Sequence, residues 1–147
     1  MDSRSTLTAL AQNAGRILLT AADVGTIVGP INADWNPSHV FNERWPSHAR
    51  FHGVVALATA AALSGFAAWR LWAPSADPSA GRDTALAAPL AYWGSFLPAW
   101  AVRGTGLEDP PHPVARLAGV PVNVIAPVAI SAVAVAGWLL DRRLRGS

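Results

Sequence analysis

Four long apolar stretches, separated by polar connections, dominate the pattern of hydrophobic and polar positions along the chain. They cover about residues 16–33, 51–72, 84–102 and 117–140. A helix needs about 17–25 mostly apolar residues to cross a bilayer, and each stretch has about that length. The pattern therefore predicts an all-α integral membrane protein, a four-helix bundle that forms a single domain over residues 1–147.

Prolines mark two of the connections and also interrupt the later stretches. Segments 74–81 and 108–113 contain several prolines, and a proline inside a helix removes a backbone hydrogen bond. Two prolines also fall within each of the third and fourth stretches. We expect them to bend those helices and to leave room for a cavity between them.

The composition supports a membrane protein and excludes nucleic-acid binding. Hydrophobic residues make up 52% of the chain and charged residues 14%, whereas soluble domains carry about 25% charged residues. Every basic residue is an arginine, and most lie near the ends of apolar stretches instead of gathering on one face. The expected partners are membrane lipids and a lipophilic small molecule, with a homo-oligomer as a further possibility. The absence of cysteine excludes disulfides.

The arginines also predict an orientation. With four spans, both termini and the connection after the second stretch share one side, which carries seven arginines against four on the other. Because short cytoplasmic segments are enriched in arginine, we expect both termini in the cytoplasm. The connection after the first stretch then lies on the opposite side of the membrane.

That first connection concentrates residues that can carry chemistry, including three of the four histidines. Residues 45–47 read Trp-Pro-Ser, which predicts a helix start because proline suits the first turn. His48 and His52 are then four residues apart on one helical face, where two imidazoles can aim at one ligand. We expect His39 and Asp34 to fold back towards this pair.

The same residues also fit a purely structural interpretation. Trp35 and Trp45 would then lie at the level of the lipid headgroups together with the histidines, while Arg44 and Arg50 bind phosphate groups. The residue types alone leave both interpretations open.

Polar and aromatic side chains within the apolar stretches are further candidates. Asp23 is a carboxylate inside a predicted span, where an ionisable residue indicates a functional site or a hydrogen bond that packs helices. Tyr92 and Trp93 either line a pocket for a lipophilic molecule or pack against neighbouring helices. Asn123 places an amide at membrane depth, where it can bind a ligand or another helix.

Residues 34–52 carry a motif, which reads DWNPSHVFNERWPSHARFH. It resembles a family of small four-helix integral membrane proteins of unknown function from actinobacteria and filamentous fungi, some of them labelled as acetyltransferases. The family pattern has threonine in place of Ser38 and two prolines in place of Pro46 and Ser47. The resemblance implies a four-helix membrane fold and no settled activity, and nothing in the residues supports acetyl transfer. By architecture alone the chain is also similar to sterol isomerase and sigma-2-type receptor bundles.

The leading hypothesis is an enzyme that acts on a lipophilic small molecule of isoprenoid or polyketide type by acid–base chemistry. Cyclisation, isomerisation or epoxide opening would fit, without a cofactor. The predicted catalytic residues are ionisable: Asp23, Asp34, His39, His48 and His52. The predicted substrate-binding residues are aromatic or polar: Trp35, Asn36, Trp45, Arg50, Tyr92, Trp93 and Asn123.

Two other hypotheses remain open at this point. In the first, His39, His48 and His52 hold a divalent metal together with Asp34 or Glu43, and the protein is a metal-dependent membrane enzyme. In the second, the protein has no catalytic role and binds a lipophilic ligand or serves in assembly. A filled interior would favour this second hypothesis, whereas a cavity that reaches the ionisable residues would favour chemistry.

Overall fold

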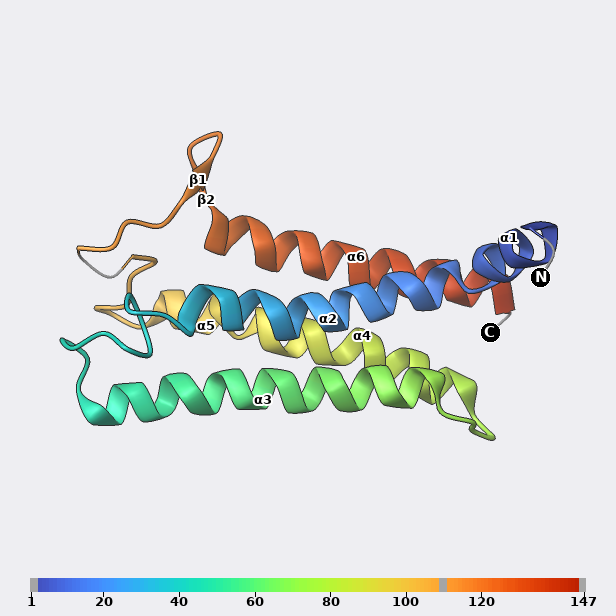
Figure 1. Ribbon diagram of the computed structural model, residues 1–147, viewed down its shortest axis with the longest axis horizontal. Coiled ribbons are helices and arrows are strands. Elements are labelled where there is room, and N and C mark those ends of the chain that lie inside the picture. The colour runs from blue at the N-terminus through green and yellow to red at the C-terminus, as the bar shows by residue number, and fades with distance from the viewer. Residues whose placement is uncertain (1–2, 109–110, 146–147) are drawn as a thin grey trace.

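Four long helices lie side by side in the computed structural model, which describes residues 3–108 and 111–145, with side chains from residue 6 (Figure 1). The helices are α1 (Ser3–Gln12), α2 (Ala14–Asp34), α3 (Ser47–Trp72), α4 (Pro78–Gly94), α5 (Phe96–Ala101) and α6 (Val122–Arg145). A two-stranded hairpin, β1 (Arg116–Leu117) and β2 (Val120–Pro121), precedes α6. Helices α2 and α4 each pack against all the other long helices, whereas α3 and α6 lie on opposite sides of this pair.

Three of these helices, α2, α3 and α6, are long and apolar enough to cross a membrane. The sequence prediction agrees with the first two within a few residues, and α3 begins at Ser47, directly after Pro46, as the Trp-Pro-Ser pattern predicted. Large apolar side chains cover the outside of the described part of the chain, among them Phe66 and Trp69 on α3 and Val128 on α6.

The third predicted span differs from the structure at both ends. Helix α4 begins at Pro78, because the carboxylate of Asp77 accepts hydrogen bonds from the backbone N–H groups of Ser79 and Ala80 and caps the helix. It ends at Gly94, and α5 continues after Ser95. Pro98 accounts for this break, because it has no N–H to donate to the carbonyl oxygen of Gly94. The prediction of a single helix over 84–102 was therefore wrong.

The fourth span was predicted to begin at about residue 117, five residues before the helix begins in the structure. Residues 116–121 form the hairpin that projects from the bundle (Figure 1), and α6 starts only at Val122. Ala118 and Gly119 form its turn with φ angles of 50° and 81°, a left-handed conformation that suits a two-residue hairpin turn.

The bundle is closed most tightly at the end where the two termini lie (Figure 1). A Cβ atom on Gly15 of α2 would lie 2.3 Å from the backbone nitrogen of Asp141 on α6. A Cβ atom on Gly81 of α4 would lie 2.5 Å from the carbonyl oxygen of Arg70 on α3. These helix pairs are thus in backbone contact here. The small buried cluster of Leu19, Leu71 and Ala85 packs at the same end.

Candidate functional site

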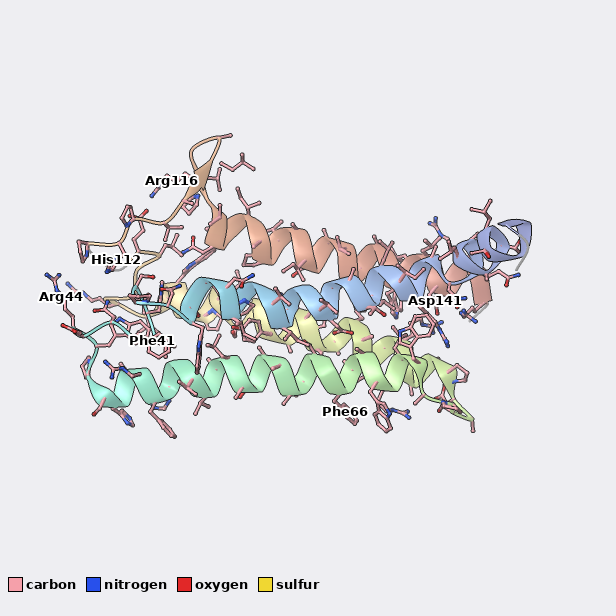
Figure 2. All side chains as sticks on the ribbon, viewed as in Figure 1. Phe41, Arg44, Phe66, His112, Arg116 and Asp141 are labelled. Atoms are coloured by element: carbon pink, nitrogen blue, oxygen red, sulfur yellow. The ribbon has the colours of Figure 1, made fainter. Side chains whose placement is uncertain are left out.

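A cavity of about 560 Å³ lies at the other end of the bundle. Its walls come from the last turns of α2, the end of α4, α5 and the first turns of α6, together with residues 105–107 and His39. Five of the predicted site residues line it: Asp34, His39, Tyr92, Trp93 and Asn123. Figure 2 labels Arg44, His112 and Arg116 at this end of the molecule and Asp141 at the opposite end.

Aromatic side chains form one wall of the cavity. The rings of Tyr92 and Trp93 meet edge to face with their centroids 4.9 Å apart, and Phe96 lies 5.4 Å from Trp93. The indole Nε1 of Trp93 donates a hydrogen bond of 3.0 Å to the Oγ1 of Thr26, which fixes the orientation of the ring. This wall is therefore mostly apolar, and the Trp93 ring within it is held in one orientation.

The polar side of the cavity carries an acid and a base. The Nε2 of His39 lies 3.9 Å from the Oδ1 of Asp34, and both side chains are only partly exposed, at 31% and 39%. This distance is too long for a direct hydrogen bond but allows a polar atom of a ligand to lie between the two groups. The carboxyl and the imidazole therefore face a common space.

The loop that carries His39 also determines which of its nitrogens holds a proton. The Oδ1 of Asn36 accepts hydrogen bonds from the backbone N–H of Ser38 at 2.8 Å and from its hydroxyl at 2.5 Å. Because the Ser38 hydroxyl donates its only proton to Asn36, it must accept from the Nδ1–H of His39, 2.8 Å away. The Nε2 of His39 then presents a free lone pair towards Asp34. Asn36 positions this network and does not line the cavity, and the substrate-binding role expected of it stays a prediction.

Asn123 contributes a second polar point on the α6 side of the cavity. Its Nδ2 donates a hydrogen bond of 2.6 Å to the carbonyl oxygen of Leu107, which ties the start of α6 to the loop before it. Its Oδ1 has no hydrogen-bond partner within residues 3–108 and 111–145. This oxygen is itself buried, so it is an unsatisfied acceptor in the wall of the cavity.

His48 and His52 lie away from this cavity, on the exposed surface of α3. Their Nε2 atoms are 3.1 Å apart, so the i, i+4 pairing predicted for them is present. His39 instead packs edge to face on Trp45, at a centroid distance of 5.7 Å. In the described part of the chain, no group of three or more histidine, aspartate or glutamate side chains lies close enough to hold a metal ion.

Three more of the predicted binding residues build the first connection and do not line the cavity. Trp35 packs edge to face on Phe41, and Trp45 lies against α3 beside Gly53. Arg50 donates a hydrogen bond of 3.0 Å to the carbonyl oxygen of Asn42. These contacts fix the course of the connection, and the binding roles expected of these residues stay predictions.

Asp23 is fully buried within α2 and does not line the cavity. Neither of its carboxylate oxygens has a hydrogen-bond partner among the described residues. The neighbouring hydroxyls of Thr20 and Thr26 donate instead to carbonyl oxygens of their own helix. The catalytic role expected of Asp23 likewise stays a prediction.

Several cavity residues were not selected from the sequence. Phe96 lies three residues after Trp93 and four before Trp100, a helical spacing that indicates one shared face and could have revealed its place in the aromatic wall. Residues 105–107 carry no comparable signal, because only the folded loop brings them to the start of α6.

Comparison with known proteins gives one match. No curated protein and no solved structure shows significant similarity to the chain. Residues 18–147, which include the whole cavity, match a family described only as a family of unknown function. The chain belongs to this family, DUF6640.

Proposed function

We propose that the chain is a multi-pass membrane protein in which α2, α3, α6 and the α4–α5 pair cross the bilayer, with both termini in the cytoplasm. The lengths and apolar surfaces of α2, α3 and α6 support this. The arginines support the orientation, because those at the end with the termini outnumber the rest. That end carries Arg16, Arg70, Arg82, Arg142, Arg143 and Arg145, and the cavity end carries Arg44, Arg50, Arg103 and Arg116.

The cavity binds a lipophilic small molecule in this proposal. Its volume of about 560 Å³ falls within the roughly 300–1,000 Å³ that such sites occupy. Its lining is mostly apolar and aromatic, with the polar groups of Asp34, His39 and Asn123 placed around it. This combination holds an apolar body while orienting one polar or reactive group.

The protein acts on this molecule by acid–base chemistry, and the observation that carries this step is the Asp34–His39 pair at the cavity. One proton held between the pair can pass from one group to a double bond or an epoxide oxygen, while the other group accepts a proton from the substrate. In an isomerisation or cyclisation one bond to hydrogen forms and another breaks, without oxidation. The faces of Tyr92 and Trp93 stabilise positive charge that develops on carbon.

Solvent isotope incorporation tests this chemistry while the substrate is still unidentified. The protein in phosphatidylcholine vesicles is incubated with an organic extract of its host membranes in D₂O, or in water labelled with ¹⁸O, and the lipids are analysed by mass spectrometry. Isomerisation or cyclisation adds one solvent deuterium to a lipid, and epoxide opening adds one labelled oxygen. Wild-type protein is expected to label a discrete species.

Variants assign this labelling to the pair. Asp34→Asn and His39→Gln are each expected to reduce it by about 10²–10⁴-fold, the usual contribution of a general acid or base. Glu43→Gln removes an exposed carboxylate from the same connection and should retain the activity. His48→Gln distinguishes this proposal from the hypothesis drawn from the sequence, in which His48 relays the proton. Labelling should be retained in this variant if only Asp34 and His39 transfer protons. Labelling that survives both Asp34→Asn and His39→Gln contradicts the proposed mechanism.

One observation favours a second candidate, a metal site at His48 and His52. Two nitrogen ligands about 2.0–2.1 Å from one tetrahedral metal lie roughly 3.3 Å apart, close to the 3.1 Å between the two Nε2 atoms. Elemental analysis of protein purified without a histidine tag tests it. Stoichiometric metal that is lost in His52→Ala would support a metal-dependent protein, and its absence in the wild type would refute one.

A further inference from the structure

A second hollow of about 300 Å³ adjoins the cavity on the outer side of α4, α5 and α6, and we call it the tail groove. Its lining is apolar apart from Asn123 and Ser131. Leu97 and Val128 at its edges are each 66% exposed, so the groove opens on the surface that faces lipid in the proposed membrane orientation.

The tail groove and the cavity share one wall. The residues that line both are Trp93, Phe96, Trp100, Asn123 and Pro127. Asp34, His39 and Tyr92 line only the cavity. The ionisable groups of the joint site therefore lie on the cavity side, and the groove side is apolar apart from Asn123 and Ser131.

The break between α4 and α5 shapes this groove. Gly94, the last residue of α4, lines the groove, and a Cβ atom there would meet nothing within 4 Å. On the facing helix, Pro127 has no N–H to donate to the carbonyl oxygen of Asn123, one turn earlier. Gly94 thus leaves the groove without side-chain bulk at the end of α4, and Pro127 removes a regular backbone hydrogen bond of α6 at the wall shared with the cavity.

We propose that the ligand is a single-chain amphiphile that enters sideways from the bilayer between α4–α5 and α6. Its polar head lies beside Asp34, His39 and Asn123, and its apolar chain lies in the tail groove. This inference rests on the proposed function, since it requires a membrane protein whose cavity binds a lipophilic molecule. It adds the chemical class of the ligand and its route. The adjacency of the two hollows, whose linings have five residues in common, carries it.

Photolabelling in nanodiscs tests the inference directly. The probe is hexadecan-1-ol with a diazirine in the middle of its chain, added to phosphatidylcholine nanodiscs that hold the full chain, and labelled peptides are mapped by mass spectrometry. Labelling is expected within residues 94–100 and 124–131, to saturate with the mole fraction of the probe and to fall at least fivefold under excess unlabelled hexadecan-1-ol. A second probe with its diazirine beside the hydroxyl is expected to label residues 105–107 and Asn123.

Matched variants separate the groove from ordinary lipid contact. Gly94→Leu fills the groove and should reduce saturable labelling at least fivefold. Gly65→Leu is its control, because Gly65 is also an exposed helical glycine whose Cβ would meet nothing within 4 Å, but it lies on α3 away from both hollows. Val128→Trp blocks the groove from α6 in case Gly94→Leu disturbs the helix break, with Val135→Trp as its control on the same helix.

The outcomes distinguish this inference from the proposed function. If the head probe labels the cavity saturably but groove labelling is unsaturable, or is unchanged in Gly94→Leu and Val128→Trp, the tail groove is a lipid-facing surface. The present inference then fails and the binding cavity stands. If neither probe labels the cavity or the groove saturably, both the inference and the proposed binding of a lipophilic molecule fail.

Discussion

At the scale of single residues, Ser38 governs the protonation pattern of His39. Its hydroxyl donates to Asn36 and therefore accepts from the Nδ1–H of the imidazole. Its backbone N–H bonds to Asn36 independently of the side chain. The hydroxyl can thus be removed without removing the turn, which separates the orientation of the imidazole from the fold of the loop.

Ser38→Ala is expected to release the preference of His39 for a proton on Nδ1. Losing one hydrogen bond of about 1 kcal/mol shifts the ratio of the two tautomers by roughly fivefold. The ¹⁵N chemical shifts of the His39 ring in labelled protein report this ratio. Ser64→Ala provides the control, because that buried hydroxyl on α3 has no partner within the described residues. Unchanged His39 shifts in Ser38→Ala would show that Ser38 does not set the tautomer.

The positions of single residues also explain which parts of the candidate site could be predicted from the sequence. Asp34 ends α2 and His39 follows five positions later in the connection, so local geometry brings them to one cavity. The direction in which His48 and His52 point depends on how α3 rotates against α2 and α4. Alanine is frequent along most of α3, so its faces differ little in hydrophobicity. The sequence therefore does not indicate which face of α3 packs against the core.

At the scale of elements, the lengths of the apolar stretches predicted where the helices lie but not where they are interrupted. The bounds of α2 and α3 follow from hydropathy and from Pro46. The break at Gly94 and the hairpin before α6 were missed, because Pro98 and Pro121 were interpreted as bends within long helices. Both interruptions occur beside the cavity, and they bring the aromatic residues of α4 and α5 and the amide of Asn123 into its walls.

Close packing of α2 on α6 depends on glycine. Gly15→Ala would force a Cβ atom into the backbone of Asp141, 2.3 Å away, and is expected to reduce the free energy of unfolding by roughly 1–3 kcal/mol or more. Gly65→Ala meets nothing within 4 Å and should be neutral or stabilising by up to about 1 kcal/mol. Thermal unfolding in one detergent compares the two variants. Equal effects would contradict the close contact between α2 and α6.

The start of α4 depends on the charge of Asp77. The hydroxyl of Ser79 and the backbone N–H groups of Ala80 and Ser79 stabilise its carboxylate, and they lower its pKa below the usual 3.8. Because the folded pKa is lower than the unfolded one, the stabilisation is fully present above the unfolded pKa and is lost as the pH falls through the folded pKa. Asp77→Ala should therefore unfold more easily at pH 7 than the wild type, in chemical denaturation at fixed temperature.

The difference between wild type and Asp77→Ala is expected to shrink as the pH falls below about 4, since protonation weakens the cap in the wild type only. Asp77→Asn serves as the control, because an uncharged amide oxygen still accepts hydrogen bonds at a helix N-terminus and does not titrate. A difference that stays constant across this pH range would mean that the carboxylate charge does not stabilise α4.

At the scale of the whole molecule, the two ends of the bundle differ in build. At the end with the termini, Asp141 is buried and accepts a hydrogen bond of 2.9 Å from Arg145, with Arg16 4.0 Å away. Arg145 also donates to the Oδ1 of Asn13, which fastens α6 to the start of α2. The opposite end holds the cavity. The closed end is thus arginine-rich, and the Asp34–His39 pair lies at the end that holds the cavity.

The orientation of these two ends is the last prediction, and the absence of cysteine makes it testable with single introduced thiols. Glu43 lies exposed at the cavity end, and Ala76 lies exposed between α3 and α4 at the end with the termini. In intact cells, a membrane-impermeant maleimide should modify Glu43→Cys and spare Ala76→Cys, whereas a permeant maleimide should modify both. If the impermeant reagent spares Glu43→Cys and modifies Ala76→Cys, the orientation is reversed and the cavity faces the cytoplasm. Because α3 is the only helix between these two positions, modification of both thiols by the impermeant reagent would mean that α3 does not cross the membrane, and the four-span topology would be wrong.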